Sequence, residues 1–183
     1  MAEDLVGRKT EIKAIKAWMK SRDSRSAENA RLGWIGGGPG LGKSMVMARL
    51  ATDYSGSRHR GFFFHRFLGG NARAARRAFL RFLEASLSAW GPIQEKSEVP
   101  VEHETEDSLI EALLERMALI EGLESPNPKA PAPSFWILVD NLDEIAGEDP
   151  GFVDLLERLA LPGTVVLTSG RSEHGLDAQF SGP

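Results

Sequence analysis

The sequence of 183 residues lacks cysteine, long apolar runs and an excess of basic residues, and each absence argues against a class of function. It has no cysteine, which excludes disulfide bonds, zinc-thiolate sites and thiol catalysis. No apolar run approaches the roughly 20 residues of a membrane-spanning helix, and the amino terminus lacks the basic and apolar segments of a signal peptide. A net charge of −4 argues against a nucleic-acid partner, because phosphates favour a basic surface. We therefore expect a soluble, cytoplasmic protein with no membrane or nucleic-acid partner.

Short apolar segments alternate along the chain with segments of helical periodicity. Strands are predicted at residues 32–35, 62–67, 135–139 and 164–168, and helices at residues 10–19, 43–53, 71–90, 109–120 and 152–161. Several of these strands are apolar on both faces, as in a parallel sheet that lies between two helical layers. We therefore expect a three-layer α/β fold in one domain, residues 1–183. Its parts are a helix and loop (1–30), the core (31–171) and the start of a connection (172–183).

A glycine-rich segment between a predicted strand and a predicted helix carries the strongest functional signal. Residues 37–44 read G-G-P-G-L-G-K-S, which has the spacing of a phosphate-binding P-loop. Glycines let consecutive backbone N–H groups point at a phosphate, and the following helix adds its positive end. In such a loop Lys43 reaches the β- and γ-phosphates, and the hydroxyl of Ser44 ligates Mg²⁺. The expected nucleotide contacts are Gly37, Gly38, Pro39, Gly40, Leu41, Gly42, Lys43, Ser44 and Met45.

An acidic segment follows the most apolar of the predicted strands. Asp140 comes directly after residues 135–139, and a carboxylate at the end of a neighbouring strand would face Mg²⁺ across the phosphate pocket. Asp143 and Glu144 follow, and one of them is a candidate to accept a proton from the attacking water. The choice between these two stays open, with Glu144 favoured. The alternative is an acidic loop of solvated charges.

The last predicted strand, residues 164–168, is followed by Ser169, Gly170 and Arg171. An arginine at this strand end can sense the γ-phosphate and stabilise charge during hydrolysis. The alternative is a solvated loop residue. Neither Asn-Lys-x-Asp nor Thr-Lys-x-Asp, the usual device for reading guanine, occurs in the chain, so ATP is preferred to GTP.

Together these segments resemble the STAND class of signal-transducing ATPases, and within it the NACHT branch. Residues 139–144, V-D-N-L-D-E, resemble the NACHT acidic motif, with Asn141 where that class has Gly, Ala or Ser. Residues 167–171, L-T-S-G-R, resemble its Thr-Ser-Arg sensor segment, with Gly170 as an insertion.

Two further segments are similar to parts of the same class. Residues 5–8, L-V-G-R, are similar to a hydrophobic-Gly-Arg segment that precedes the P-loop. This likeness implies that Val6, Gly7 and Arg8 lie near adenine. Residues 62–67, F-F-F-H-R-F, look like the second strand of the class, in which we expect His65 to be structural.

The resemblance implies a molecular switch that binds ATP or ADP with Mg²⁺ and hydrolyses ATP slowly. Exchange of ADP for ATP permits homo-oligomerisation in such proteins. Effector and sensor domains, here outside the chain, then produce an output in signal transduction, with innate immunity as one setting.

The resemblance also implies a mostly parallel sheet of the additional-strand type. The P-loop strand then lies between the strand at 164–168 and a fifth strand that this chain lacks. We therefore expect a fragment without the lid and winged-helix parts. Two other readings stay open: an AAA+ motor or loader ATPase, in which Glu more often stands where this chain has Asn141, and a nucleotide-binding interaction module without hydrolysis.

Overall fold

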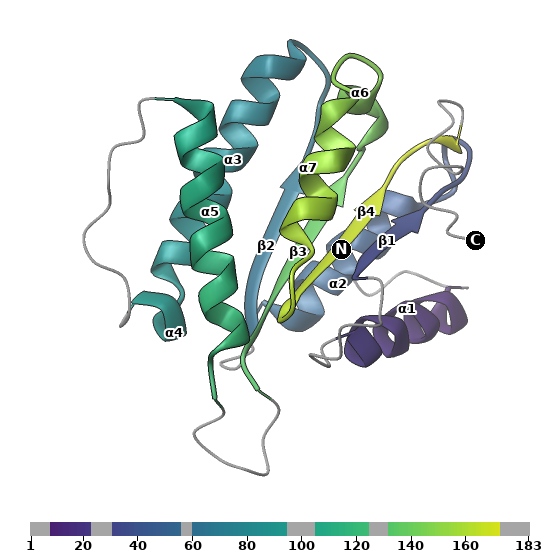
Figure 1. Ribbon diagram of the computed structural model, residues 1–183. Coiled ribbons are helices and arrows are strands. Elements are labelled where there is room, and N and C mark those ends of the chain that lie inside the picture. The colour runs from purple at the N-terminus through teal and green to yellow at the C-terminus, as the bar shows by residue number, and fades with distance from the viewer. Residues whose placement is uncertain (1–7, 23–30, 56–59, 95–104, 125–131, 173–183) are drawn as a thin grey trace.

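The computed structural model describes residues 8–22, 31–55, 60–94, 105–124 and 132–172 (Figure 1). The expectations for Val6, Gly7 and most of the connection after the core fall outside these residues. In chain order the elements are α1 (Lys9–Arg22), β1 (Leu32–Ile35), α2 (Lys43–Tyr54), β2 (Arg60–Arg66), α3 (Ala72–Ala89), α4 (Gly91–Gln94), α5 (Glu106–Glu121), β3 (Ser134–Asp140), α6 (Asp143–Ala146), α7 (Gly151–Leu159) and β4 (Thr164–Ser169). None of the described helices combines the length and the apolar character needed to cross a membrane.

The described strands form one sheet in the order β1-β4-β3-β2, and every neighbouring pair is parallel. β3 lies inside the sheet and is buried along its whole length, as its unbroken apolar sequence predicts. β1 pairs with β4, and no other described strand pairs with its outer side. The P-loop strand therefore neighbours the strand that ends near Arg171, as expected, and forms an edge of the described sheet.

Helices cover both faces of the sheet (Figure 1). Successive residues of a strand point to opposite faces, so β3 contributes to two separate cores. Phe135, Ile137 and Val139 belong to the core that includes α3, α5 and α7. Trp136 and Leu138 belong to the core that includes α1 and α2. These two cores give the three layers that the sequence predicts, although the sheet is wholly rather than mostly parallel.

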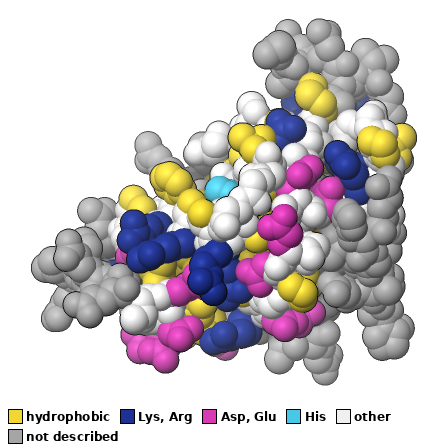
Figure 2. All heavy atoms as spheres, turned by 90° about the horizontal axis from the view of Figure 1, so that it is seen from above, with side chains coloured by type: hydrophobic (Ala, Val, Ile, Leu, Met, Phe, Trp, Pro, Cys, Tyr) yellow, Lys and Arg dark blue, Asp and Glu magenta, His cyan; other side chains and the backbone are white. Residues whose placement is uncertain are grey.

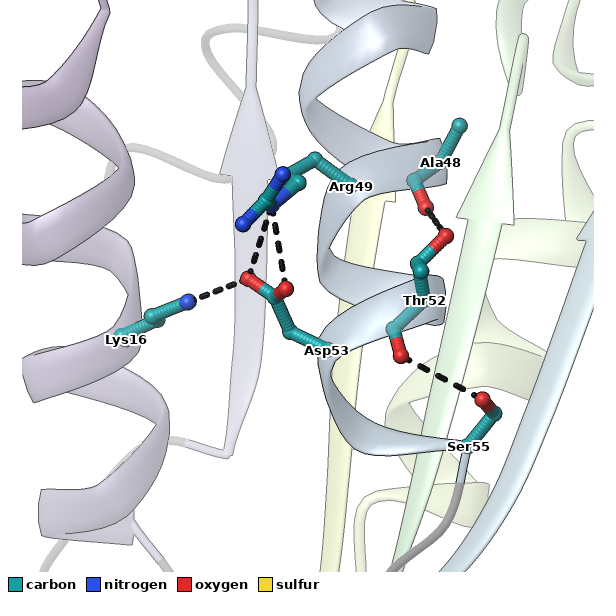
Figure 3. A network of polar contacts seen from close by, with 6 residues as sticks. All are labelled: Lys16, Ala48, Arg49, Thr52, Asp53 and Ser55. Atoms are coloured by element: carbon teal, nitrogen blue, oxygen red, sulfur yellow. Dashed lines mark hydrogen bonds and ion pairs between the residues drawn. The ribbon is translucent and has the colours of Figure 1, made fainter. Parts of the chain in front are cut away.

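Polar contacts fasten α1 to α2 (Figure 3). Lys16 of α1 forms an ion pair with Asp53 of α2, and Arg49 contacts the same carboxylate at 3.0 Å. Burial by itself would raise the pKa of Asp53, but hydrogen bonds from Lys16 and Arg49 hold this pKa below its ordinary value. Because α1 begins directly after Arg8, this contact helps to hold Arg8 beside the helix that follows the P-loop.

The sequence patterns did not predict two helices of four residues, α4 and α6. One helical turn is too short to show a 3.6-residue periodicity, so no pattern could reveal either of them. α6 begins at Asp143, which means that part of the acidic segment is a helical turn rather than a loop.

Candidate nucleotide-binding site

The segment between β1 and α2 has a backbone that glycine follows most easily. Gly37, Gly40 and Gly42 have φ angles of 149°, 74° and 74°, in a region that side-chain-bearing residues rarely adopt. Gly42 is the N-cap of α2, so the unpaired N–H groups of the first helical turn lie at the end of the loop. A Cβ added at Gly38 or Gly40 would meet no atom within 4 Å, so both positions border open space. The loop and the helix start have the features of an anion cradle.

The side chain of Lys43 folds back over this loop. Its ammonium donates hydrogen bonds to the carbonyl oxygens of Gly37, at 2.7 Å, and Gly38, at 2.9 Å. Ser44 is half-buried in the first turn of α2, next to Lys43. The remaining expected contacts, Leu41 and Met45, are 49% and 44% exposed, and Pro39 is also exposed. The lysine charge is thus already held at the loop.

Arg8 lies beside the P-loop, although 34 positions separate it from Gly42 in the sequence. A Cβ added at Gly42 would be 3.9 Å from the Nε atom of Arg8. The carbonyl of Arg8 accepts the first hydrogen bond of α1, from the N–H of Ile12 at 3.0 Å. Arg8 therefore lies close to the glycine-rich loop between β1 and α2.

Backbone hydrogen bonds link the carboxyl ends of the four strands in a row. Going from β1 to β2, the bonds run from Gly170 N–H to Ile35 O (3.3 Å), from Leu142 N–H to Ser169 O (2.8 Å) and from Phe67 N–H to Asp140 O (3.0 Å). The P-loop, the acidic segment and the segment around Arg171 therefore meet at the carboxyl end of the strands, where α/β proteins bind ligands. Figure 2 views the molecule from this end and shows acidic, basic and hydrophobic side chains interspersed.

Asn141 shapes the chain directly after Asp140. Its φ angle is 60°, in the left-handed region that Asn tolerates better than most residues. Its side-chain amide donates a hydrogen bond to the carbonyl of Phe67 at 3.1 Å. The residue that departs from the NACHT pattern thus has a structural role in joining the ends of β3 and β2.

Asp140 is fully buried at the end of β3. Its Oδ1 atom accepts a hydrogen bond from the hydroxyl of Ser169 at 2.5 Å. Its Oδ2 atom is buried without a hydrogen-bond partner and lies 3.5 Å from Nε of Arg66. The sequence patterns did not predict that Ser169 or Arg66 would contact Asp140. Their position at a strand end could have indicated this contact, since each is the last residue of a strand that neighbours β3.

Arg171 lies over the acidic pair. Its Nε is 3.5 Å from Oδ2 of Asp143, and its Nη2 is 3.8 Å from Oε1 of Glu144. The side chain of Asp143 is 5% exposed and that of Glu144 is 34% exposed, so the two carboxylates differ in access to water. Arg171 is therefore close to both carboxylates, of which Asp143 is shielded from water and Glu144 is accessible to it.

Gly170 lets the strand end approach α6 closely. A Cβ at this position would lie 2.6 Å from Cη2 of Trp34 and 2.7 Å from Oδ1 of Asp143. Both distances are far inside van der Waals contact, so only glycine fits without movement. The residue that looked like an insertion therefore brings Arg171 toward the acidic segment.

A bound Mg²⁺ would need few protein ligands at this edge. Within the ranges that the structure describes, no group of three or more His, Cys, Asp or Glu side chains is arranged to hold a metal ion. Mg²⁺ at nucleotide sites commonly takes only one or two protein oxygens, together with phosphates and water. The buried Oδ2 of Asp140, which lacks a hydrogen bond, fits such a ligand.

His65 packs inside an aromatic cluster rather than at the site. The centroid of its ring lies 6.1, 4.6 and 5.4 Å from the ring centroids of Phe63, Phe67 and Phe79, respectively. Burial lowers its pKa below the ordinary value of about 6.5. The contacts agree with the structural role expected for this residue.

We expect His65→Phe to reduce the acid sensitivity of the fold. The unfolded chain protonates this histidine near pH 6.5, but the folded chain does so only at lower pH. The contribution of His65 is therefore present above pH 6.5 and is lost as the pH falls below that value. Urea unfolding near neutral pH and about two units lower would measure it; an unchanged difference between these pH values in the variant would contradict the expectation.

A glycine-rich loop between the first strand and its helix, at the carboxyl edge of a parallel sheet between helices, defines the P-loop NTPase fold. More specifically, the chain belongs to the nephrocystin 3 N-terminal family, whose model matches residues 10–169. No curated protein matches the sequence.

A solved structure shares the fold at low sequence identity. Cdc6p from Pyrobaculum aerophilum matches with a TM-score of 0.60 and 15% identity, over 96% of this chain and 41% of that one. The chain thus spans less than half the length of that relative. PCH-2 from C. elegans matches at a TM-score of 0.38 and 11% identity, over 88% of this chain and 36% of that one, a likeness too weak for argument. Neither match names the STAND class or its NACHT branch.

Proposed function

We propose that this chain is the ATP-binding, slowly hydrolysing switch domain of a NACHT/STAND-type ATPase. The observation that carries the proposal is the row of hydrogen-bonded strand ends, which gathers the P-loop, Asp140 and Arg171 at one sheet edge. The proposed ligands are ATP and ADP with Mg²⁺. We further propose that the ATP-bound form self-associates within a longer protein, whose effector and sensor domains lie outside this chain. The NACHT-like residues 139–144 and 167–171 support this finer assignment.

Each group at the site has a proposed role in binding. The N–H groups of residues 37–44 would donate to phosphate oxygens, and Lys43 would exchange the carbonyls of Gly37 and Gly38 for the β- and γ-phosphates. Ser44 and Asp140 would hold Mg²⁺, which when bound neutralises charge on the phosphates during their transfer. Arg8, which lies close to Gly42, would contact the nucleotide from the side of α1.

Glu144 is the better placed of the two candidate bases. The side chain of Glu144 is one-third exposed, so water can reach it, whereas the side chain of Asp143 is only 5% exposed. Arg171 contacts both carboxylates in the described conformation. For hydrolysis it has to leave Glu144, and the γ-phosphate offers the guanidinium a stronger negative charge. This exchange accounts for the slow turnover that we propose.

Two alternative functions follow from the sequence, and a contact in the structure favours one of them. The pairing of Arg171 with both carboxylates also suits a nucleotide-binding module that does not hydrolyse ATP. The motor or loader ATPase stays an alternative from the sequence alone, because the likeness to Cdc6p at 15% identity shows only the fold. Phosphate release separates the non-hydrolysing module from both enzymes, and ATP-dependent assembly size in a longer chain separates switch from motor.

The direct test is calorimetric titration of the purified chain with ADP and with a non-hydrolysable ATP analogue, with and without Mg²⁺. Phosphate release from ATP is measured in parallel. We expect saturable binding that Mg²⁺ strengthens, and slow release. No binding at millimolar nucleotide would contradict the proposal.

A further inference from the structure

The buried carboxylate of Asp140 has an unusual pair of neighbours. Ser169 satisfies Oδ1 with a hydrogen bond, but Oδ2 has no hydrogen-bond donor and is shielded from water. A buried carboxylate in this condition is costly unless a positive charge lies close by. Among the described residues, the ion pair found at Oδ2 is with Arg66.

The strand register places Arg66 on the nucleotide side of the sheet. Arg66 is the direct partner of Asp140 between β2 and β3. Two residues earlier along β3, and on the same face, Leu138 packs in the core with α1 and α2. Arg66 and Asp140 therefore project from the face that the P-loop helix covers.

The two side chains of this ion pair differ in their exposure to solvent. Nε of Arg66 lies 3.5 Å from Oδ2, and the arginine side chain is 51% exposed while that of Asp140 is 1% exposed. The carboxylate is fixed, whereas the guanidinium can swing into solvent at small cost.

We propose that Arg66 is the resident counter-ion of Asp140 and competes with the divalent cation for its Oδ2 atom. This inference rests on the proposed function, in which Asp140 holds Mg²⁺. A guanidinium and Mg²⁺ at the same oxygen would repel each other, so binding of the metal displaces Arg66. Arg66 thereby stabilises the metal-free protein and lowers the gain in nucleotide affinity that Mg²⁺ provides.

The metal arm of the test compares ADP affinity with and without Mg²⁺ by calorimetry. We expect the ratio of the two affinities to be about threefold to tenfold larger in Arg66→Gln than in the unaltered chain. Arg66→Lys keeps the positive charge and should keep the original ratio. Arg81→Gln removes the same charge from the exposed middle of α3 and serves as the matched control. An unchanged or smaller ratio in Arg66→Gln would overturn the competition.

The second arm needs no nucleotide. With metal removed by EDTA, Arg66→Gln should lower the melting temperature by about 2–4 °C, because it leaves the carboxylate without its counter-ion. In the Asp140→Asn background the same change should have no effect. Equal shifts in both backgrounds would overturn the pairing itself. If the unaltered chain binds no ADP, the proposed function is wrong. The melting temperatures of the single and double variants then still decide whether Arg66 neutralises Asp140.

Discussion

Replacing Lys43 with alanine is expected to weaken ATP and ADP binding by about 100-fold or more, because a charge-assisted hydrogen bond contributes roughly 3 kcal/mol. The other donors at the loop are neutral N–H groups, so Lys43 supplies the main point charge for the β- and γ-phosphates. Calorimetric titration of the variant and of the unaltered chain measures this loss.

The same substitution should leave the domain folded. In the described structure Lys43 bonds only to loop carbonyls, which solvent can reach once the side chain is gone. A melting temperature within a few degrees of the original value is therefore expected. Lys20→Ala, at an exposed position near the end of α1, removes the same charge elsewhere and should bind nucleotide normally. Undiminished affinity in Lys43→Ala would refute the phosphate-binding role of this loop.

The elements that the sequence predicts well are those whose pattern is local. β3 is an unbroken apolar run, and its full burial follows directly from that run. The P-loop is readable because glycine spacing encodes backbone conformation, and three of its glycines do have positive φ angles. The bounds of β1 also match the prediction, because Gly36 ends a short apolar segment.

The features that the sequence could not predict depend on which strands become neighbours. The contacts of Asp140 with Arg66 and Ser169 join residues 74 and 29 positions apart, and the register that pairs them appears only when the sheet forms. The close fit of Gly170 against Trp34 and Asp143 joins three elements in the same way. No linear spacing encodes such contacts.

Replacing Glu144 with glutamine is expected to slow ATP hydrolysis by about 100-fold, the lower end of what a general base contributes. ATP affinity should stay close to its original value, because the ion pair of Glu144 is with Arg171 rather than with the P-loop and removing a proton acceptor spares the ground-state contacts. The measurement is single-turnover hydrolysis with protein in excess over ATP, since turnover of the unaltered chain is itself slow. Glu148→Gln, an exposed carboxylate just after α6, is the matched control and should hydrolyse ATP normally.

Asp143→Asn separates the two candidate bases. The side chain of Asp143 is 5% exposed, and its Oδ2 lies 3.5 Å from Nε of Arg171. Asp143 also lies against Gly170, so its charge positions Arg171 more than it meets water. We expect this variant to lower the melting temperature and to reduce hydrolysis less than Glu144→Gln does. If instead Asp143→Asn abolishes turnover while the melting temperature is unchanged, Asp143 is the base and Glu144 holds Arg171. If neither substitution alters the rate of phosphate release, water activation lies outside this acidic pair, and the chain is then better described as a nucleotide-binding module.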